Sequence, residues 1–545
     1  MSGFISNCYS ASISPKISLV EGVQTKYEPE NKNPVDENGV SQNIYVNPTF
    51  SQASDNNPGT ELLPVKTLKG AAQIVSKNIR KNIGTKVILY PGTYRESIRI
   101  ISNQQENAPI IFEAKEASSV IISGSDIWED WQQYEQNKNI YTHSWRYDWG
   151  VADNPWPEKI EVPEIVRRKE IIFINGKLLR QRLSLRELTP GSFYVSEEQD
   201  KVFIYPEPET NLETSKIEVG TRHRLIFTKG VNNLVLRGLK FYHSNDYRRE
   251  AVLILSGKNI LVENCEFLWN NSDALTIAIS ENVIVRKVIA NHNGTRGVAG
   301  NRLKNAYYQD VESSYNNWRG DWGSFYWWDP GQKFLFTRNL TFHRYKAVGN
   351  MAAGLWLDTD NSNVWIDEAE ICDNFHTGLY IEASHHILVS NSKICHNRAN
   401  PESNYHHPGI LGSTSSHVTL ENNVICGNDR SQIKVQVVKH YGARVIPNWE
   451  TGEEYPLTSQ NWVLRNNIIV GEKADQMLIF FQPNTEDFAD NLFSEGNIWY
   501  NPENNQVFQI GVRNRDKKDF QKWQELTGQE QKSVFASPGE NYSCG

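Results

Sequence analysis

Two short segments of this 545-residue sequence carry an acidic residue at the same place, Gly-Leu-Trp-Leu-Asp358 and Gly-Leu-Tyr-Ile-Glu382. If both segments are β-strands, side chains alternate between two faces, and Asp358 and Glu382 share the face that the leucines and the isoleucine do not use. On neighbouring parallel strands the two carboxylates would lie about 5 Å apart and repel each other, which raises the pKa of one of them. A separation of about 5–5.5 Å is typical of retaining glycosidases, in which one carboxylate attacks carbon and the other transfers the proton.

The residues near this acidic pair suit a sugar substrate. Trp356 and Tyr380 lie on the same predicted face, and flat aromatic rings pack well against the C–H faces of sugars. Asp360 follows two residues after Asp358 and should also point outward, so it is the main rival for the acid role. Other candidates for substrate binding on this face and in its loops are His385, His407, Lys434 and Gln436.

Neither a metal nor a cofactor is predicted. His406 and His407 are adjacent in a loop, and neighbouring histidines in a loop rarely share one metal ion. The sequence has no phosphate-binding loop, zinc-ligand spacing or nucleophilic serine elbow at a credible place.

Tryptophan is concentrated in two parts of the chain. Five of the 16 tryptophans fall within residues 128–156 and four within 318–328. We expect Trp322, Trp327 and Trp328 of the second group to line a sugar-binding cleft beside Asp358 instead of filling a core. The first group would belong to a separate domain that overhangs the same face.

A repeated pattern indicates the elements that position these residues. From about residue 230, an Asn or His precedes a short apolar strand, and the pattern recurs at intervals of 26, 23, 23, 28, 30, 23, 31 and 44 residues. A minimum repeat of 23 residues with longer versions predicts a fixed β-coil whose loops accept insertions, as in a parallel β-helix. The coils start at Asn233, Asn259, Asn282, Asn305, Lys333, Asn363, His386, His417 and Asn461.

The coil corners and the cysteines follow the same register. We expect Asn264, Asn391, Asn422 and Asn466 to turn corners in the left-handed conformation and to hydrogen-bond along the column. The six cysteines are too few and too scattered for a disulfide scaffold. Three of them lie nine residues after a coil start and are predicted to form an inward stack of small apolar thiols, namely Cys372, Cys395 and Cys426.

The predicted organisation is all-β with five parts. Residues 1–40 are polar and irregular, and residues 41–125 hold a helical cap and the first coils. Residues 126–225 interrupt the repeat with alternating strands typical of a small inserted antiparallel β domain. Residues 226–512 form the main parallel β-helix, and residues 513–545 form a C-terminal cap or tail.

Composition excludes several partners. A formal net charge of −8 disfavours nucleic acid or an anionic membrane as the main partner. The chain lacks an apolar run long enough for a membrane span, which needs about 18 residues. The first twenty residues lack the basic start and apolar core of a secretory signal, so a cytoplasmic location is expected, with secretion by another route left open.

The motifs also resemble those of a known group. Asn57-Pro-Gly-Thr, Pro91-Gly-Thr-Tyr-Arg-Glu and the later coils resemble bacterial right-handed parallel β-helix proteins that act on polysaccharides. The two acidic strands resemble the active-site strands of glycoside hydrolase family 120, the β-xylosidases, which also carry a β-sandwich inserted in the β-helix. The resemblance implies that Asp358 is the nucleophile and Glu382 the general acid/base. The chain departs from that family directly after each acid.

Three functions stay open at this point. The first is a retaining glycoside hydrolase acting on a β-linked oligosaccharide. The second is a polysaccharide lyase or uronate epimerase on the same face, with Lys434 as a base and a Ca²⁺ near Asp358 and Asp360. The third is a β-helix that binds carbohydrate without turnover. The aromatic character of the face favours a neutral sugar and therefore the hydrolase.

Overall fold

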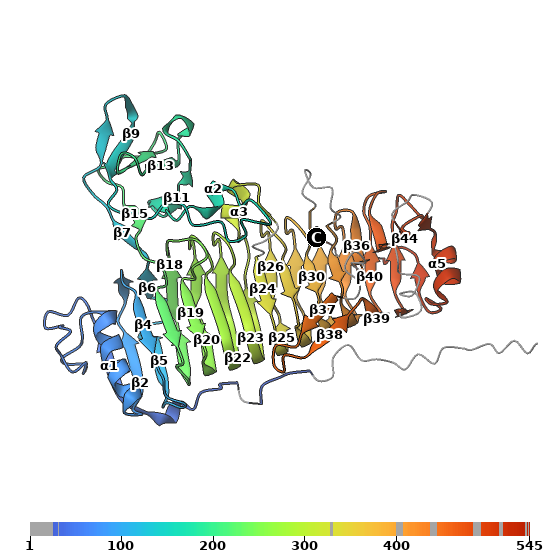
Figure 1. The fold of residues 1–545 in the computed structure, drawn as a ribbon, viewed down its shortest axis with the longest axis horizontal. Coiled ribbons are helices and arrows are strands. Elements are labelled where there is room, and N and C mark those ends of the chain that lie inside the picture. Colours follow the sequence, from blue (N-terminus) through green and yellow to red (C-terminus); the bar gives the residue numbers. More distant parts are fainter. Residues whose placement is uncertain are drawn as a thin grey trace, which may run out of the picture.

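The main body of the molecule is a long column of parallel β-strands (Figure 1). The computed structural model describes residues 26–30, 32–326, 331–398, 407–436, 444–482, 492–511, 516–539, 542 and 544. The strands of successive coils pair in parallel, which confirms the predicted all-β class and parallel β-helix. None of the helices in this part of the chain has the length and apolar character needed to cross a membrane.

Each coil contributes three strands, and each strand pairs with its counterpart in the next coil. Strands β27 (Leu355–Asp358), β28 (Ser362–Asp367) and β29 (Glu370–Cys372) pair with β30 (Leu379–Glu382), β31 (His385–Ser390) and β32 (Lys393–Cys395). The inward side chains of β27 and β30 are fully buried in one continuous core. Full burial of a Leu or Ile side chain stabilises the fold by roughly 1.5–3 kcal/mol. Because β27 and β30 are held in register by this core, their outward side chains are held in register too.

Asparagine ladders run along three edges of the column. One buried ladder links the coils through bonds such as Asn374 Nδ2 to Asn397 Oδ1, at 2.9 Å. Its members are Asn270, Asn293, Asn316, Asn350, Asn374, Asn397 and Asn428. The four predicted corner residues all have left-handed φ angles, between 51° and 58°. The hydrogen bonds along this second edge are made by the asparagine that follows each predicted corner residue. Asn423 donates to Asn467, and Asn467 donates to Asn497.

A further ladder, formed by the asparagines at the coil starts, corrects one predicted coil start. Asn339 occupies the corner between Asn305 and Asn363, since its Nδ2 donates to Asn305 Oδ1 at 2.9 Å and its Oδ1 accepts from Asn363 Nδ2 at 2.6 Å. Lys333 was predicted at this corner but lies one strand earlier, in β24 (Gln332–Leu335). There it pairs with Trp356 of β27.

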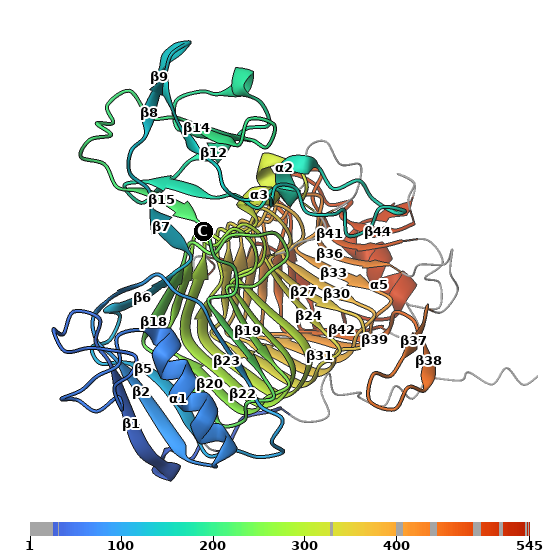
Figure 2. The same ribbon diagram turned by 60° about the vertical axis from the view of Figure 1, so that its left-hand side comes forward.

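Helices close the two ends of the column. Helix α1 (Leu68–Arg80) begins after Thr67, whose side chain accepts a hydrogen bond from the Gly70 N–H at 2.9 Å, and its apolar face joins the main core. Figure 2 shows α1 lying across the first strands, β1 (Val40–Val46) and β2 (Gly84–Leu89). At the other end, α5 (Phe520–Thr527) inserts the fully buried Trp523 against the last rungs.

Two small sheets between β7 (Ser125–Ile127) and β15 (Ile217–Gly220) stand off the early part of the column (Figure 1). They enclose a separate apolar core that includes Trp145. Helix α2 (Glu164–Arg167) of this part packs against α3 (Trp318–Trp322) of the column. Buried Arg319 of α3 fixes the contact by donating to Asn271 Oδ1 and to the Glu170 carbonyl.

The cysteines stand in register, but on the outside of the column. The isoleucine before each cysteine occupies the main core, so alternation turns the cysteine outward. Two disulfides form there, Cys372–Cys395 between adjacent rungs and Cys426–Cys544 to the C-terminal segment. The predicted inward stack of free thiols is therefore wrong. Sequence spacing fixed the register, but it could not tell which of two adjacent apolar residues faces the core.

Candidate functional site

The two acids of the predicted pair lie opposite each other at the ends of adjacent strands. Asp358 ends β27, Glu382 ends β30, and the two residues are register partners in the parallel ladder. Strands in such a ladder are about 4.8 Å apart, so both carboxyl groups occupy one small region of the outer surface. The side chains are 15% and 19% exposed, enough for contact with a ligand while most of the solvent is excluded.

Two neighbours hold the Asp358 carboxylate. Lys333 Nζ lies 2.8 Å from Oδ2, and the Thr359 hydroxyl donates to Oδ1 at 2.7 Å. The Lys333 ammonium group also lies 3.7 Å from the centre of the Trp356 ring, a cation–π contact that fixes the lysine over the strand. Asp358 is thus oriented and charge-balanced from the preceding rung.

Glu382 has a different environment. Arg444 of β37 (Arg444–Pro447) places one guanidinium nitrogen 2.7 Å from Oε1. Burial, and then the negative charge of Asp358, raise the pKa of Glu382, and the opposing effect of Arg444 does not cancel them. Glu382 therefore retains a proton to higher pH than an ordinary glutamate. One carboxyl group charge-balanced by a lysine, beside another whose pKa is raised, is the division of roles that acid–base catalysis requires.

The aromatic rings beside the acids are less open than predicted. Trp356 and Tyr380 stack with their ring centres 4.7 Å apart and leave the main core, as alternation predicts. Both are nearly covered, at 3% and 8% exposure, with Leu411 of the next rung completing the cluster. They form a packed wall that supports the acids, where an exposed platform was expected.

Comparisons with known proteins agree with this architecture. The model of the family described as "Right handed beta helix region" matches residues 224–509, more than half of the chain. The chain belongs to this right-handed β-helix family.

The individual proteins that match share little sequence with this chain, or match only a short part of it. The uncharacterized protein YwoF of Bacillus subtilis (strain 168) is 31% identical over 96 residues, which span 18% of this chain and only 19% of YwoF. The structure of XylC in complex with xylose superimposes with a TM-score of 0.64 at 13% identity and covers 91% of this chain and 87% of that one. The A-module of the Azotobacter vinelandii mannuronan C-5 epimerase AlgE4 gives a TM-score of 0.48 at 12% identity, over 90% of this chain and 100% of that module. At 13% identity the match to XylC establishes the β-helix fold and nothing further.

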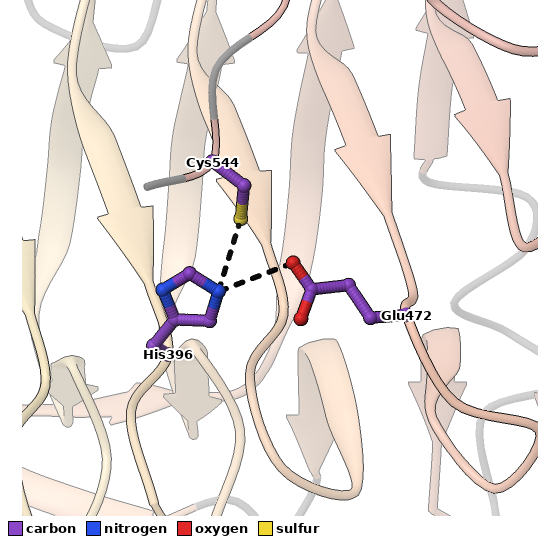
Figure 3. Close-up of side chains that lie close together, drawn as sticks. All are labelled: His396, Glu472 and Cys544. Atoms are coloured by element: carbon purple, nitrogen blue, oxygen red, sulfur yellow. Dashed lines mark hydrogen bonds and ion pairs between the residues drawn. The ribbon is translucent and has the colours of Figure 1, made fainter.

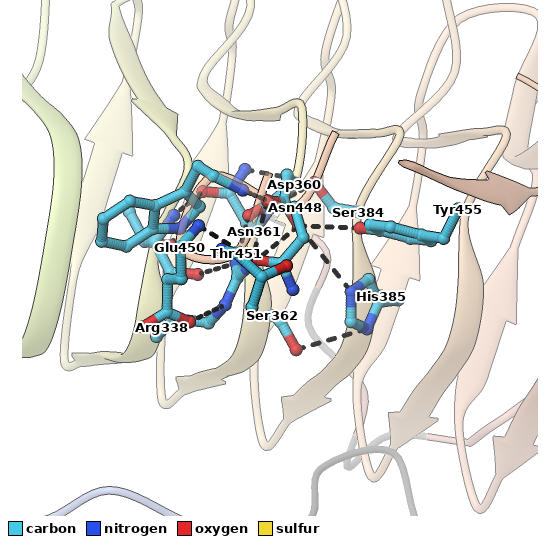
Figure 4. Close-up of polar contacts among 12 residues, drawn as sticks. Arg338, Asp360, Asn361, Ser362, Ser384, His385, Asn448, Glu450, Thr451 and Tyr455 are labelled. Carbon is cyan, nitrogen blue, oxygen red and sulfur yellow. Dashed lines mark hydrogen bonds and ion pairs between the residues drawn. The ribbon is translucent and has the colours of Figure 1, made fainter. Parts of the chain in front are cut away.

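Asp360 does not compete with Asp358 for the acid role, which corrects the sequence-based expectation. Its side chain is fully buried and forms an ion pair with Arg338 at 2.9 Å (Figure 4). It also accepts hydrogen bonds from the Trp449 N–H at 2.8 Å and the Tyr455 hydroxyl at 2.7 Å. Both donors come from the hairpin of β37 and β38 (Glu454–Leu457), so Asp360 fastens this hairpin to the column. Asp360 does not point outward as predicted because Thr359 and Asp360 have left-handed φ angles, which end the strand and the alternation of its side chains.

The predicted histidines lie in two different places. His385 belongs to the Asp360 cluster, where its Nδ1 contacts Ser362 Oγ at 3.2 Å (Figure 4). Burial lowers the pKa of His385 to about 4. His407 instead packs against His376 with the two rings tilted and their centres 3.8 Å apart, just before β33 (Ile410–Ser413). Its neighbour His406 lies outside the described residues.

Lys434 and Gln436 lie on β36 (Ser431–Gln436), two rungs beyond β30. Glu382, Ser413 and Gln436 are register partners on three successive strands, and the Gln436 side chain donates to the Ser413 hydroxyl at 3.1 Å. Burial lowers the pKa of Lys434 to about 8, and among the described residues this lysine forms no ion pair. Its lowered pKa means that Lys434 loses its proton at a lower pH than an ordinary lysine, which is what a lysine base requires.

The tryptophan groups have other surroundings than expected. Trp322 packs on Trp318, at 4.6 Å between ring centres, in the contact between α3 and the inserted sheets. Trp128, Trp131 and Trp149 pack on the core of the inserted sheets, which lie over earlier rungs than β30 (Figure 1). Trp322 is thus part of an internal contact instead of a cleft beside Asp358. Trp327 and Trp328 lie outside the described residues.

Sequence reasoning missed two residues that act directly on the acids, Lys333 and Arg444. Lys333 had a signal, because phasing its coil on Asn339 places it on β24, the strand before that of Asp358. Nothing in the sequence pointed to Arg444, because it lies 62 residues after Glu382 in a hairpin that interrupts the repeat.

Proposed function

We propose that this chain is a retaining glycoside hydrolase for a β-linked, uncharged oligosaccharide. The observation that carries the proposal is the register pair Asp358 and Glu382, with Lys333 on the first carboxylate and a raised pKa on the second. The resemblance of the two acidic strands to β-xylosidases, and the xylose bound to the similarly folded XylC, support xylosides as the first substrates to test.

In this proposal Glu382 donates its proton to the glycosidic oxygen while Asp358 attacks the anomeric carbon. The bond to the leaving group breaks and a glycosyl ester forms on Asp358. The Glu382 carboxylate then takes a proton from water, whose oxygen attacks the same carbon and frees Asp358. Two displacements give net retention of configuration. Lys333 and Thr359 position the nucleophile, and Arg444 positions the proton donor.

The test uses aryl β-glycosides, with wild type and Glu382→Gln compared. We expect wild type to release a sugar of retained configuration, measured by NMR. Glu382→Gln should still form the glycosyl-enzyme from an activated substrate but hydrolyse it slowly, and azide should restore turnover and give a glycosyl azide. Glu370→Gln is the matched control, since Glu370 is half exposed and lies on β29, which pairs with β32 and not with the strands of Asp358 and Glu382. No turnover on any glycoside, or no azide effect, would reject the proposal.

Lys434 favours a second candidate, a lyase or epimerase that removes a proton next to a uronate carboxyl group. A lysine base acts in its neutral form, so this activity would rise with pH through the lysine pKa of about 8. A lyase would give unsaturated products that absorb in the ultraviolet, and Lys434→Gln would abolish them. The hydrolase instead requires protonated Glu382, so its activity falls as pH rises through the raised pKa of that residue.

A further inference from the structure

The outer cysteine column ends in a cluster of metal-ligand side chains that the proposed active site does not use. His396 follows Cys395 at one corner, and Glu472 comes from the corner two rungs further along (Figure 3). Cys544 reaches the same point from the C-terminal segment. The ligand atoms of the three residues all lie within 4.8 Å of one another.

The backbone leaves space for this cluster. Gly427 lies at the corner between the rungs of His396 and Glu472 and has a left-handed φ of 62°. A Cβ atom at this position would lie 2.4 Å from His396 Cδ2 and 2.9 Å from Glu472 Cδ. Any side chain at residue 427 would therefore push the imidazole and the carboxylate apart.

The distances match the edges of a tetrahedral zinc site. With Zn–S of about 2.3 Å and Zn–N and Zn–O of about 2.0–2.1 Å, the expected edges are about 3.6 Å for S···N and about 3.3 Å for N···O. The Cys544 Sγ to His396 Nε2 distance is 3.5 Å, and His396 Nε2 to Glu472 Oε1 is 3.1 Å. Cys426 Sγ, bonded to Cys544 Sγ, is the available fourth ligand.

We propose that reduction of the Cys426–Cys544 disulfide creates a zinc site formed by Cys426, Cys544, His396 and Glu472. In the disulfide the two sulfur atoms are joined to each other, and a metal ligand must be a thiolate. A dithiol donates two electrons and two protons to the disulfide and is itself oxidised to a disulfide. Zn²⁺ then displaces the two thiol protons into solvent and binds both sulfurs, His396 Nε2 and a Glu472 oxygen.

With such a site, Cys544 would be attached to the column in both redox states. Under oxidising conditions the disulfide ties residue 544 to the column, and under reducing conditions the metal makes the same connection. The side chains of His396 and Glu472 are 32% and 40% exposed, so a metal ion can enter from solvent.

The test is metal binding by the full chain after reduction with a water-soluble phosphine, which takes oxygen from water to become the phosphine oxide. After anaerobic removal of the phosphine, we expect Co²⁺ to bind one equivalent with thiolate-to-cobalt charge-transfer absorption and tetrahedral d–d bands. Zn²⁺ should displace it, and native mass spectrometry should show one added zinc. The oxidised chain should show none of these signals.

Variants make the assignment specific. Cys544→Ser should lose tight binding, and Glu472→Gln, at a partly exposed position that tolerates the change, should weaken it while the circular dichroism spectrum is unchanged. Cys372→Ser is the matched control, because Cys372 belongs to the same column but lies two rungs from Cys426, and it should bind cobalt like wild type. Reduced wild type that binds no cobalt, or Cys544→Ser that binds it as tightly as wild type, would overturn the proposal.

Discussion

Asp358 and Asp360 are two positions apart in sequence and occupy opposite kinds of site. Each pairs with a basic side chain, Asp358 with Lys333 at 2.8 Å and Asp360 with Arg338 at 2.9 Å. Asp358 ends a strand and keeps one side open, whereas Asp360 turns a corner and is fully enclosed by the β37–β38 hairpin. The comparison teaches that backbone conformation after the strand, more than residue type, separates an acid that can meet a ligand from one that fastens the fold.

The largest expected difference comes from Asp358→Asn. An amide cannot act as the nucleophile, so kcat/KM for an aryl glycoside should fall by at least ~10³-fold. Stability should change little, because Glu382 lies beside the same lysine and can take over the ion pair. Kinetics and urea unfolding measure the two effects. Activity within tenfold of wild type would remove Asp358 from the proposed nucleophile role.

Asp360→Asn should show the reverse pattern. It removes the charge of the fully buried Asp360 from its ion pair with Arg338, whose side chain is 16% exposed and also pairs with Glu450. Loss of one member of a fully buried ion pair costs about 3–5 kcal/mol, and the second partner should keep the cost at or below that range. The free energy of unfolding, from urea titration, should fall accordingly. Equal stability losses in the Asp358 and Asp360 variants would erase the distinction between the two acids.

Tyr455→Phe tests the same comparison at a single hydrogen bond. The Tyr455 hydroxyl donates to Asp360 at 2.7 Å, and a hydrogen bond to a charged group contributes about 1.5–3 kcal/mol. Thr359→Val is the matched change at the other acid, since it removes the 2.7 Å bond to Asp358 and keeps the side-chain shape. We expect the first to lower stability and the second to lower kcat. The opposite assignment would show that Asp358 is the structural acid.

The smallest effect is expected in the pH profile of Arg444→Gln. Arg444 lowers the pKa of Glu382, so its removal should raise that pKa further. The hydrolase needs protonated Glu382, and its kcat/KM falls as pH rises through this pKa. The alkaline limb of the profile should therefore move to higher pH in Arg444→Gln. It should stay in place in the control Arg465→Gln, because Arg465 pairs with a different glutamate, Glu421. A limb that moves to lower pH would contradict the proton-donor role of Glu382.

Repetition in the sequence was sufficient to predict the fold and the register of the acidic pair. Residues that repeat every 23 residues or more report a fixed coil, and two acids at one place in successive coils must be neighbours. Where the repeat is ambiguous, the prediction was wrong. Lys333 and Asn339 both precede apolar strands, and only the asparagine ladder identifies the true corner.

The remaining errors have local or long-range causes. Alternation holds only within a strand, so it misplaced Asp360, which lies in a left-handed corner. Alternation also could not show that Ile371, and not Cys372, points into the main core. Arg444 was not predictable, because its contact with Glu382 depends on how an inserted hairpin folds back on the column.

The buried asparagine ladder makes whole coils the natural unit of change in this molecule. Each asparagine donates from its side chain or its backbone N–H to the side-chain oxygen of the next one at the same corner, whether the two are 23, 31 or 34 positions apart. Deleting one residue inside a strand would exchange its two faces and interrupt the ladder, whereas deleting an entire coil would bring equivalent asparagines together again. Evolution can thus lengthen, shorten or decorate this column in full steps, and the acids of one coil pair retain their geometry while distant coils come and go.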